Sequence, residues 1–177
     1  MISRIFSQYI IFNVLHISNS GCLYGDMPTT GASMSYKIIP KGLPGYEDYH
    51  AIQITYNLSS GVQDKRHPYP GSPYFAIGFP KIAFLPDTDL GRKVLKLLEK
   101  AFNQQLTYTL TTQWGSNDAM VTWNPAIGHK TEFGPSEGKL SYPDPAYLED
   151  VARQLARLGI NSEDLGDDDD DDEVTNV

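Results

Sequence analysis

Short strand-like segments follow one another along this sequence instead of alternating singly with helices, and this order constrains the fold most. Five segments of alternating apolar and polar residues, rich in β-branched and aromatic side chains, are predicted as strands: 34–39, 51–58, 81–85, 106–111 and 119–124. Strict alternation with helices would predict a parallel sheet, whereas runs of strands favour antiparallel pairing. We therefore predict an α+β domain with a mostly antiparallel sheet and helices packed against one face.

Two segments, 88–103 and 145–158, show the periodicity of amphipathic helices. Asp87 or Asp89 is expected to cap the first helix, and Asp144 the second, because a carboxylate there accepts a hydrogen bond from a free backbone N–H group. The expected buried faces are Leu90, Val94, Leu97, Leu98, Ala101 and Phe102 in the first helix and Leu148, Val151, Leu155 and Leu158 in the second.

Acidic charge is concentrated near the end of the sequence. Asp167 to Glu173 is an unbroken run of seven acidic residues, and removing these charges from the formal net charge of −8 leaves −1. The remaining chain carries no basic patch that could follow a phosphate backbone, so we expect no direct nucleic-acid partner. We predict an N-terminal extension over 1–25, a compact domain over 26–160 and a disordered acidic tail over 161–177.

The N-terminal extension contains an apolar stretch from Tyr9 to Leu15 that follows Arg4. Asn13 interrupts it, and it is shorter than the roughly 20 residues that cross a bilayer, so a plain extension is favoured over a signal or anchor and no membrane partner is expected. Cys22 is the only cysteine, which excludes an internal disulfide and a multi-cysteine zinc site. We expect a cytoplasmic or nuclear protein.

Few residues offer chemistry without further context. No glycine-rich nucleotide loop, metalloprotease helix or nucleophile elbow is present. His129 and Glu132 could work as a general acid–base pair, or simply form a surface hydrogen bond in a loop, and two such side chains are too few for a metal site. The C-terminal half of the sequence contains several large aromatic residues, which either line a cleft and stack on a base or ribose, or belong to the core. They are Trp114, Trp123, Tyr142 and Tyr147.

The first predicted helix also has a basic face formed by Arg92, Lys93, Lys96 and Lys100. This face could meet an acidic partner, but a solvated helix surface is the simpler interpretation.

Several segments together resemble the Deltex C-terminal domain. They occur in the order of that family and with nearly its spacing: GLPGYE (42–47), ITYNLSSGVQ (54–63), HPYPG (67–71), GFP (78–80), FLPD (84–87), GRKVLKLL (91–98), VTWN (121–124), HKTEFG (129–134) and YPDPAYL (142–148). The resemblance implies a compact α+β domain that binds ADP-ribose or NAD in a cleft. It also implies a role in protein ubiquitination, linked in the family to Notch signalling.

In full-length members of the family a RING domain lies upstream and recruits a ubiquitin-conjugating enzyme. The pair then ubiquitinates ADP-ribosylated proteins or ADP-ribose itself. A RING domain needs about eight cysteine or histidine zinc ligands. Residues 1–25 contain only His16 and Cys22, so we expect no zinc in this chain and a RING, if any, in a longer or partner chain.

Four positions depart from the family pattern. Leu140 stands where the family has its catalytic histidine, and Gln154 stands where it has its catalytic glutamate. Gly128 replaces one of two adjacent histidines, and the bulky Trp114 occupies a loop where the family has small residues. Leucine cannot accept a proton and glutamine has no charge, so the general base and its partner are missing.

The resemblance therefore predicts recognition without catalysis. We expect the domain to bind ADP-ribose, NAD or ADP-ribosylated proteins through Thr112, Trp123, His129 and Tyr142, with no required cofactor. One alternative is a component of an active RING-type ubiquitin-protein ligase whose RING lies outside this chain. The other is a protein-interaction domain with a degenerate pocket.

Overall fold

The computed structural model describes residues 9–11, 16–17 and 23–161, except 114, 136 and 137. The acidic run from Asp167 and the side chain of Trp114, both singled out in the sequence, lie outside the described residues. Along the chain the elements are β1 (Tyr9–Ile11), β2 (His16–Ile17), β3 (Leu23–Tyr24), β4 (Ser33–Ile39), β5 (Ala51–Asn57), β6 (Gly61–Val62), β7 (Pro73–Phe75), β8 (Lys81–Pro86), α1 (Asp89–Asn103), β9 (Tyr108–Gln113), β10 (Ala119–Trp123) and α2 (Tyr147–Arg157).

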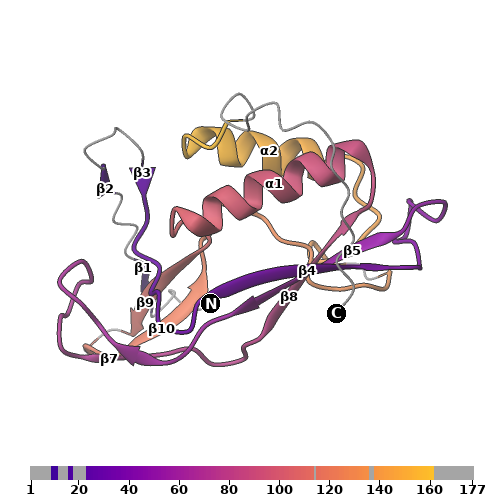
Figure 1. Ribbon diagram of the computed structural model, residues 1–177. Coiled ribbons are helices and arrows are strands. Elements are labelled where there is room, and N and C mark those ends of the chain that lie inside the picture. Colours follow the sequence, from indigo (N-terminus) through magenta and orange to yellow (C-terminus); the bar gives the residue numbers. More distant parts are fainter. Residues whose placement is uncertain (1–8, 12–15, 18–22, 114, 136–137, 162–177) are drawn as a thin grey trace, which may run out of the picture.

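The two larger sheets lie on one side of the helices, and the β2–β3 pair stands beside the helices (Figure 1). One sheet has the order β4-β5-β8, and a second has the order β1-β9-β10-β7-β6, while β2 and β3 pair with each other. Every pairing is antiparallel except that of β7 with β10. The predicted α+β fold with mostly antiparallel strands is confirmed.

All five predicted strands are present, as β4, β5, β8, β9 and β10. The short strands β6 and β7 were not predicted, because two or three residues are too few to show an alternating pattern. Part of the predicted extension 1–25 also joins the larger sheet, since Ile10 of β1 pairs with Thr112 of β9.

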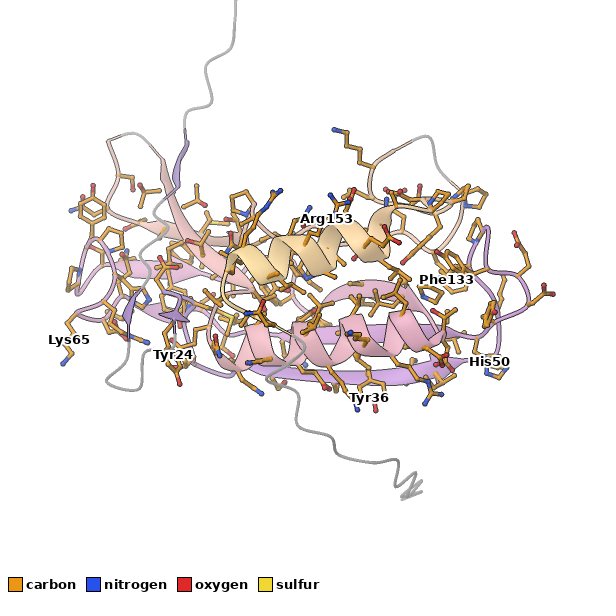
Figure 2. The ribbon with its side chains drawn as sticks, turned by 90° about the horizontal axis from the view of Figure 1, so that it is seen from above. Tyr24, Tyr36, His50, Lys65, Phe133 and Arg153 are labelled. Atoms are coloured by element: carbon orange, nitrogen blue, oxygen red, sulfur yellow. The ribbon has the colours of Figure 1, made fainter. Side chains whose placement is uncertain are left out.

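The core lies between β5 and α1. Ile52, Ile54 and Tyr56 alternate along β5 and are buried, because β5 is the middle strand of its sheet. The α1 residues that pack in the same core are Val94, Leu95, Leu97, Leu98, Ala101 and Phe102. Seen from above, β4 carries Tyr36 beyond the edge of α1, away from the side where α2 carries Arg153 (Figure 2).

The start of α1 differs from the prediction in two respects. Thr88 caps the helix, and its Oγ1 accepts a hydrogen bond from the Gly91 N–H group at 3.0 Å, so neither predicted aspartate is the cap. Gly91 is packed so closely that an added Cβ would lie 1.9 Å from the carbonyl oxygen of Pro86. Leu90, predicted in the core, is instead 40% exposed, because it lines an open hollow between α1 and α2.

Helix α2 begins at Tyr147, two residues after the predicted start, with Ala146 as an N-cap that makes no side-chain hydrogen bond. Asp144 does not cap the helix, because its carboxylate pairs with the ammonium group of Lys130 at 2.6 Å. Within the described part of the chain, neither helix combines the length and apolar character needed to cross a membrane.

Candidate functional site

An aromatic cluster gathers residues near the C-terminal ends of β5 and β10. Trp123 stacks on His129 with ring centroids 4.0 Å apart, and Tyr108 stacks on the same indole at 4.6 Å. The ring of Tyr56 meets Tyr108, Trp123 and His129 edge-on, with centroids between 5.4 and 5.8 Å. Two of the four predicted ligand-binding residues, Trp123 and His129, are therefore in direct contact.

The loop after β10 places His129 against Trp123 through a tight turn. Asn124 holds the turn, because its Nδ2 group donates to the Leu106 carbonyl at 2.7 Å and its Oδ1 atom accepts from the Ala126 N–H group at 3.0 Å. Beyond His129, the Lys130 carbonyl accepts a hydrogen bond from the Phe84 N–H group at 2.8 Å. The chain thus runs along the outer edge of β8 at this point, which fixes the backbone on either side of the imidazole.

His129 is a neutral imidazole with one free acceptor. Its Nδ1 atom lies 3.2 Å from the Ile127 carbonyl, which can only accept, so Nδ1 carries the proton. Burial away from water lowers the pKa of His129 to about 4, against an ordinary value of 6.5. At neutral pH the Nε2 atom is therefore an unprotonated acceptor, and it is buried with no hydrogen-bond partner among the described residues.

Two further polar atoms of the cluster share this property. The hydroxyl groups of Tyr56 and Tyr108 are also buried without a partner among the described residues. Burial raises the pKa of both phenols well above its usual range, so each hydroxyl keeps its proton and can donate it. Buried polar atoms of folded proteins are paired in the great majority of cases, so three such atoms around one stack indicate a site for a polar ligand or for water.

The rim of the cluster carries a positive charge. The ammonium nitrogen of Lys81 lies 5.2 Å from the centroid of Phe79 and 6.0 Å from that of Trp123. Phe79 in turn packs on Tyr108 at 5.2 Å. Trp123 and Lys81 are half-buried, so this side of the cluster is open to solvent and adds a cation to an otherwise aromatic surface.

The other two predicted ligand-binding residues lie apart from this contact. Tyr142 is fully buried, donates its hydroxyl to the Phe84 carbonyl at 3.1 Å, and packs edge-on against Tyr46 and Tyr147. Thr112 is buried in β9, where it is four residues from Tyr108, a separation of roughly 13 Å along an extended strand. Tyr142 therefore supports the loop that carries His129, while Thr112 lies farther along the sheet.

Gln154 and Leu140, two of the positions that depart from the family pattern, both contact this loop. Gln154 points its Oε1 atom at the Gly128 N–H group and accepts a hydrogen bond at 2.7 Å, while the Tyr147 hydroxyl donates to the Gly128 carbonyl at 3.2 Å. The Leu140 side chain is 49% exposed, and the Leu140 carbonyl accepts hydrogen bonds from the N–H groups of the two residues after Lys130. Neither side chain can act as a base.

His129 and Glu132 do not form the acid–base arrangement that was considered from their spacing. His129 is buried in the cluster, whereas Glu132 is exposed, so the two side chains lie in different environments. Among the described residues, no group of three or more histidine, cysteine or carboxylate side chains is arranged to hold a metal ion.

Tyr56, Tyr108 and Lys81 were missed from the sequence. Tyr56 and Tyr108 stand at inward positions of strands and look like ordinary core residues, and only their unpaired hydroxyls set them apart. That property depends on neighbours distant in the sequence, so no local pattern could reveal it.

The fold and the site define an α+β domain with a buried aromatic cluster and three buried polar atoms that have no partner among the described residues. The family model of the Deltex C-terminal domain matches residues 24–160, and the chain belongs to that family.

Three relatives illustrate the similarity. The chain is 41% identical over 144 residues to the E3 ubiquitin-protein ligase DTX1 of Xenopus laevis, covering 80% of this chain and 23% of that protein. It is 42% identical over 132 residues to the E3 ubiquitin-protein ligase DTX4 of Mus musculus, covering 73% of this chain and 21% of that protein. It is 40% identical over 144 residues to the probable E3 ubiquitin-protein ligase DTX3 of Homo sapiens, covering 81% of this chain and 41% of that protein. The matched region therefore spans well under half the length of each relative.

Proposed function

We propose that this domain binds ADP-ribose, NAD or an ADP-ribosylated protein at the aromatic cluster, without transferring ubiquitin by its own residues. The observation that carries the proposal is the buried, unpaired Nε2 atom of His129, stacked on Trp123. A neutral imidazole held in this way accepts a hydrogen bond from a ligand hydroxyl or amine. Membership of the Deltex family supports the choice of ligand class, because the resemblance implies ADP-ribose binding.

The chemistry of the cluster suits a nucleotide diphosphate sugar. Ribose hydroxyls can donate to the Nε2 atom of His129, while ring or ribose oxygens can accept from the hydroxyls of Tyr56 and Tyr108. The base offers a flat surface to aromatic side chains, and the diphosphate offers negative charge to Lys81 at the rim. The Nε2 atom of His129, the hydroxyls of Tyr56 and Tyr108, and the Lys81 ammonium group would then each have a partner on the ligand.

Catalysis is not supported by the residues beside the loop. A hydroxyl nucleophile of ADP-ribose would need a general base, which typically contributes a rate factor of roughly 100 to 10,000. Leu140 has no titratable group, and Gln154 uses its Oε1 atom to hold the Gly128 amide. The loop is thus organised for binding rather than for moving a proton.

Calorimetric titration with ADP-ribose tests the proposal. We expect heat of binding from the full chain, and a loss of affinity of roughly tenfold to a hundredfold in His129→Phe, since an unpaired polar group in a buried site costs about 1–3 kcal/mol. Phenylalanine keeps a flat ring against Trp123 but removes the acceptor. Titration with NAD and with adenosine then shows which part of the ligand is required.

His50→Phe is the matched control, because it makes the same change at an exposed position away from the cluster. It should bind ADP-ribose as the unaltered chain does. The proposal is wrong if the folded chain releases no heat with millimolar ADP-ribose, or if His129→Phe binds as tightly as the unaltered chain.

A second candidate is a component of a larger ubiquitin-protein ligase. The relatives are named as E3 ubiquitin-protein ligases and are much longer than the matched region, which favours this possibility. Joining a competent RING domain to the full chain and assaying ubiquitin transfer to ADP-ribose tests it. Robust transfer would show that Leu140 and Gln154 do not prevent the reaction.

A further inference from the structure

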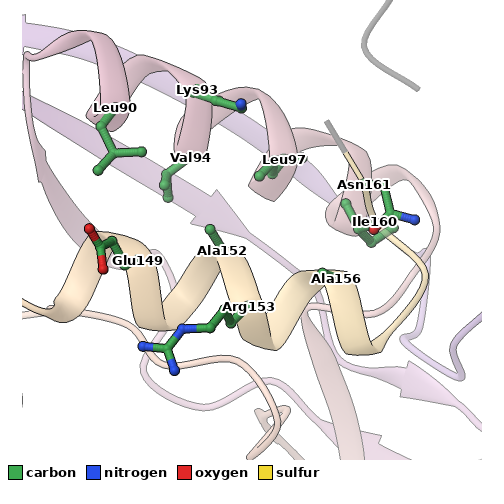
Figure 3. Close-up of a pocket in the computed structure, with 10 residues that line it drawn as sticks. All are labelled: Leu90, Lys93, Val94, Leu97, Glu149, Ala152, Arg153, Ala156, Ile160 and Asn161. Atoms are coloured by element: carbon green, nitrogen blue, oxygen red, sulfur yellow. The ribbon is translucent and has the colours of Figure 1, made fainter. Parts of the chain in front are cut away.

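A groove separates the outer faces of α1 and α2, on a part of the surface that the aromatic cluster does not use. The two helices run in the same direction, with Leu90 beside Glu149 at one end and Leu97 beside Ala156 at the other (Figure 3). The hollow between them measures about 580 Å³. Its lining residues are Leu90, Lys93, Val94, Leu97, Glu149, Ala152, Arg153, Ala156, Ile160 and Asn161.

The floor of the groove is apolar and one rim is basic. Leu90 and Ala156 are exposed although both are apolar, so the floor is open to solvent. Lys93 lines the groove from α1, and Lys96 lies three residues further along the same helix at another exposed position. Arg153 lines the groove from α2, where its guanidinium group already pairs with the carboxylate of Asp150. Glu149 is the one acidic residue of the lining.

We propose that this groove binds the acidic segment 162–177 of the same chain. Asn161, the last described residue, is itself part of the groove lining, so the segment starts at the binding surface. The segment contains Leu165 and the acidic run Asp167 to Glu173, with no lysine or arginine. Leu165 covers the apolar floor, and the acidic run meets the basic rim.

The length of the segment allows this arrangement. Leu165 follows Asn161 by four residues, which reach up to about 13 Å, and Asp167 follows it by six, which reach up to about 20 Å. Leu97 and Lys93 are four residues apart on α1, about 6 Å along the helix axis. The acidic run can therefore come alongside Lys93 and Lys96 without strain.

Attachment to the domain makes a weak contact sufficient. A short flexible link gives an effective concentration in the millimolar range, so a contact with a dissociation constant of about 0.1 mM would be formed in about nine tenths of the molecules. Because exposed charges supply much of the attraction, the contact should weaken as salt shortens the screening length from about 10 Å at 0.1 M to about 3 Å at 1 M.

Carbodiimide cross-linking of the full chain tests the proposal, because this reagent joins carboxylates to lysine amines that touch them. At low salt we expect mass spectrometry to find links from the acidic run to Lys93 and Lys96 in the monomer, several-fold above links to the exposed lysines Lys37 and Lys65. Lys65 lies at one end of the molecule in Figure 2 and serves as an internal reference. In 1 M salt the preference should disappear.

Ala156→Glu provides a test that leaves the lysines in place. It adds a negative charge at an exposed position of the groove, where glutamate is also a good helix former, and should lower the links to Lys93 and Lys96 several-fold. Ser35→Glu adds the same charge on the exposed strand β4 and should leave them unchanged. Links distributed evenly over exposed lysines, an unaffected Ala156→Glu variant, or links found only between two copies of the chain would each overturn the proposal.

Discussion

The buried imidazole of His129 should make the stability of the domain depend on pH in a way that one substitution isolates. Burial holds the pKa of His129 at about 4 in the folded chain, while the ordinary value of 6.5 applies when the chain unfolds. The unfolded state therefore binds the proton more readily between pH 6.5 and pH 4. Because of this, the free energy of unfolding is highest above pH 6.5 and falls as the pH falls through that interval.

The size of the effect follows from the two pKa values. At pH 5 the contribution of His129 amounts to a loss of about 2 kcal/mol, and below pH 4 the loss levels off at about 3 kcal/mol. His129→Phe keeps a ring stacked on Trp123 but cannot take up a proton. The variant should thus lose less stability between pH 7 and pH 5 than the unaltered chain, by about 2 kcal/mol.

Urea unfolding followed by tryptophan fluorescence at pH 7 and pH 5 measures this difference. Comparing the change with pH, rather than the stability itself, removes the constant effect of replacing histidine by phenylalanine. His50→Phe again serves as the control at an exposed position. An equal pH dependence in His129→Phe and the unaltered chain would refute the conclusion that His129 is buried in its neutral form.

Two other substitutions test close packing and charge burial elsewhere in the domain. Gly91→Ala should destabilise the domain by roughly 1–3 kcal/mol in urea unfolding, because the added Cβ would collide with the Pro86 carbonyl oxygen. Gly134→Ala is the control and should change stability little, because a Cβ at Gly134 would have no neighbouring atom within 4 Å. Asp26 is buried beside Thr109, and burial raises its pKa to about 6, so the folded state loses stability as the pH rises from about 4 through 6. Asp26→Asn should therefore exceed the unaltered chain in stability at pH 7.5 by up to about 3 kcal/mol and by much less at pH 4, and a constant difference between the two proteins would contradict this.

The loop that carries His129 is held by hydrogen bonds that require no charged side chain. Tyr147 and Gln154 hold the loop in place through hydrogen bonds to Gly128. Tyr142 donates to the carbonyl of Phe84, the β8 residue whose N–H group donates to the Lys130 carbonyl in the loop. These contacts need shape and hydrogen-bonding atoms but no charge. The uncharged side chain of Gln154 can therefore support the loop through its Oε1 atom.

The main elements of the fold were predictable from the sequence because they depend on local periodicity. The strand that became β5 alternates between buried and half-buried positions, β8 contains a short run of apolar residues, and both helices have a continuous apolar stripe. The ends of the helices were less predictable. Thr88 replaced the expected aspartates as a cap, and Asp144 was drawn away from α2 by Lys130, a partner fourteen residues earlier in the chain.

For the site, the sequence by itself determined the family and the candidate residues, among them Trp123 and His129, which lie close together in the chain. The tertiary structure decided which candidates meet, because β5 brings Tyr56 and β9 brings Tyr108 to the same stack from distant parts of the sequence. It also decided that Tyr142 uses its hydroxyl to hold the backbone of Phe84. The sequence shows which polar atoms the chain contains, but whether each of them finds a hydrogen-bond partner depends on the packing of the folded chain.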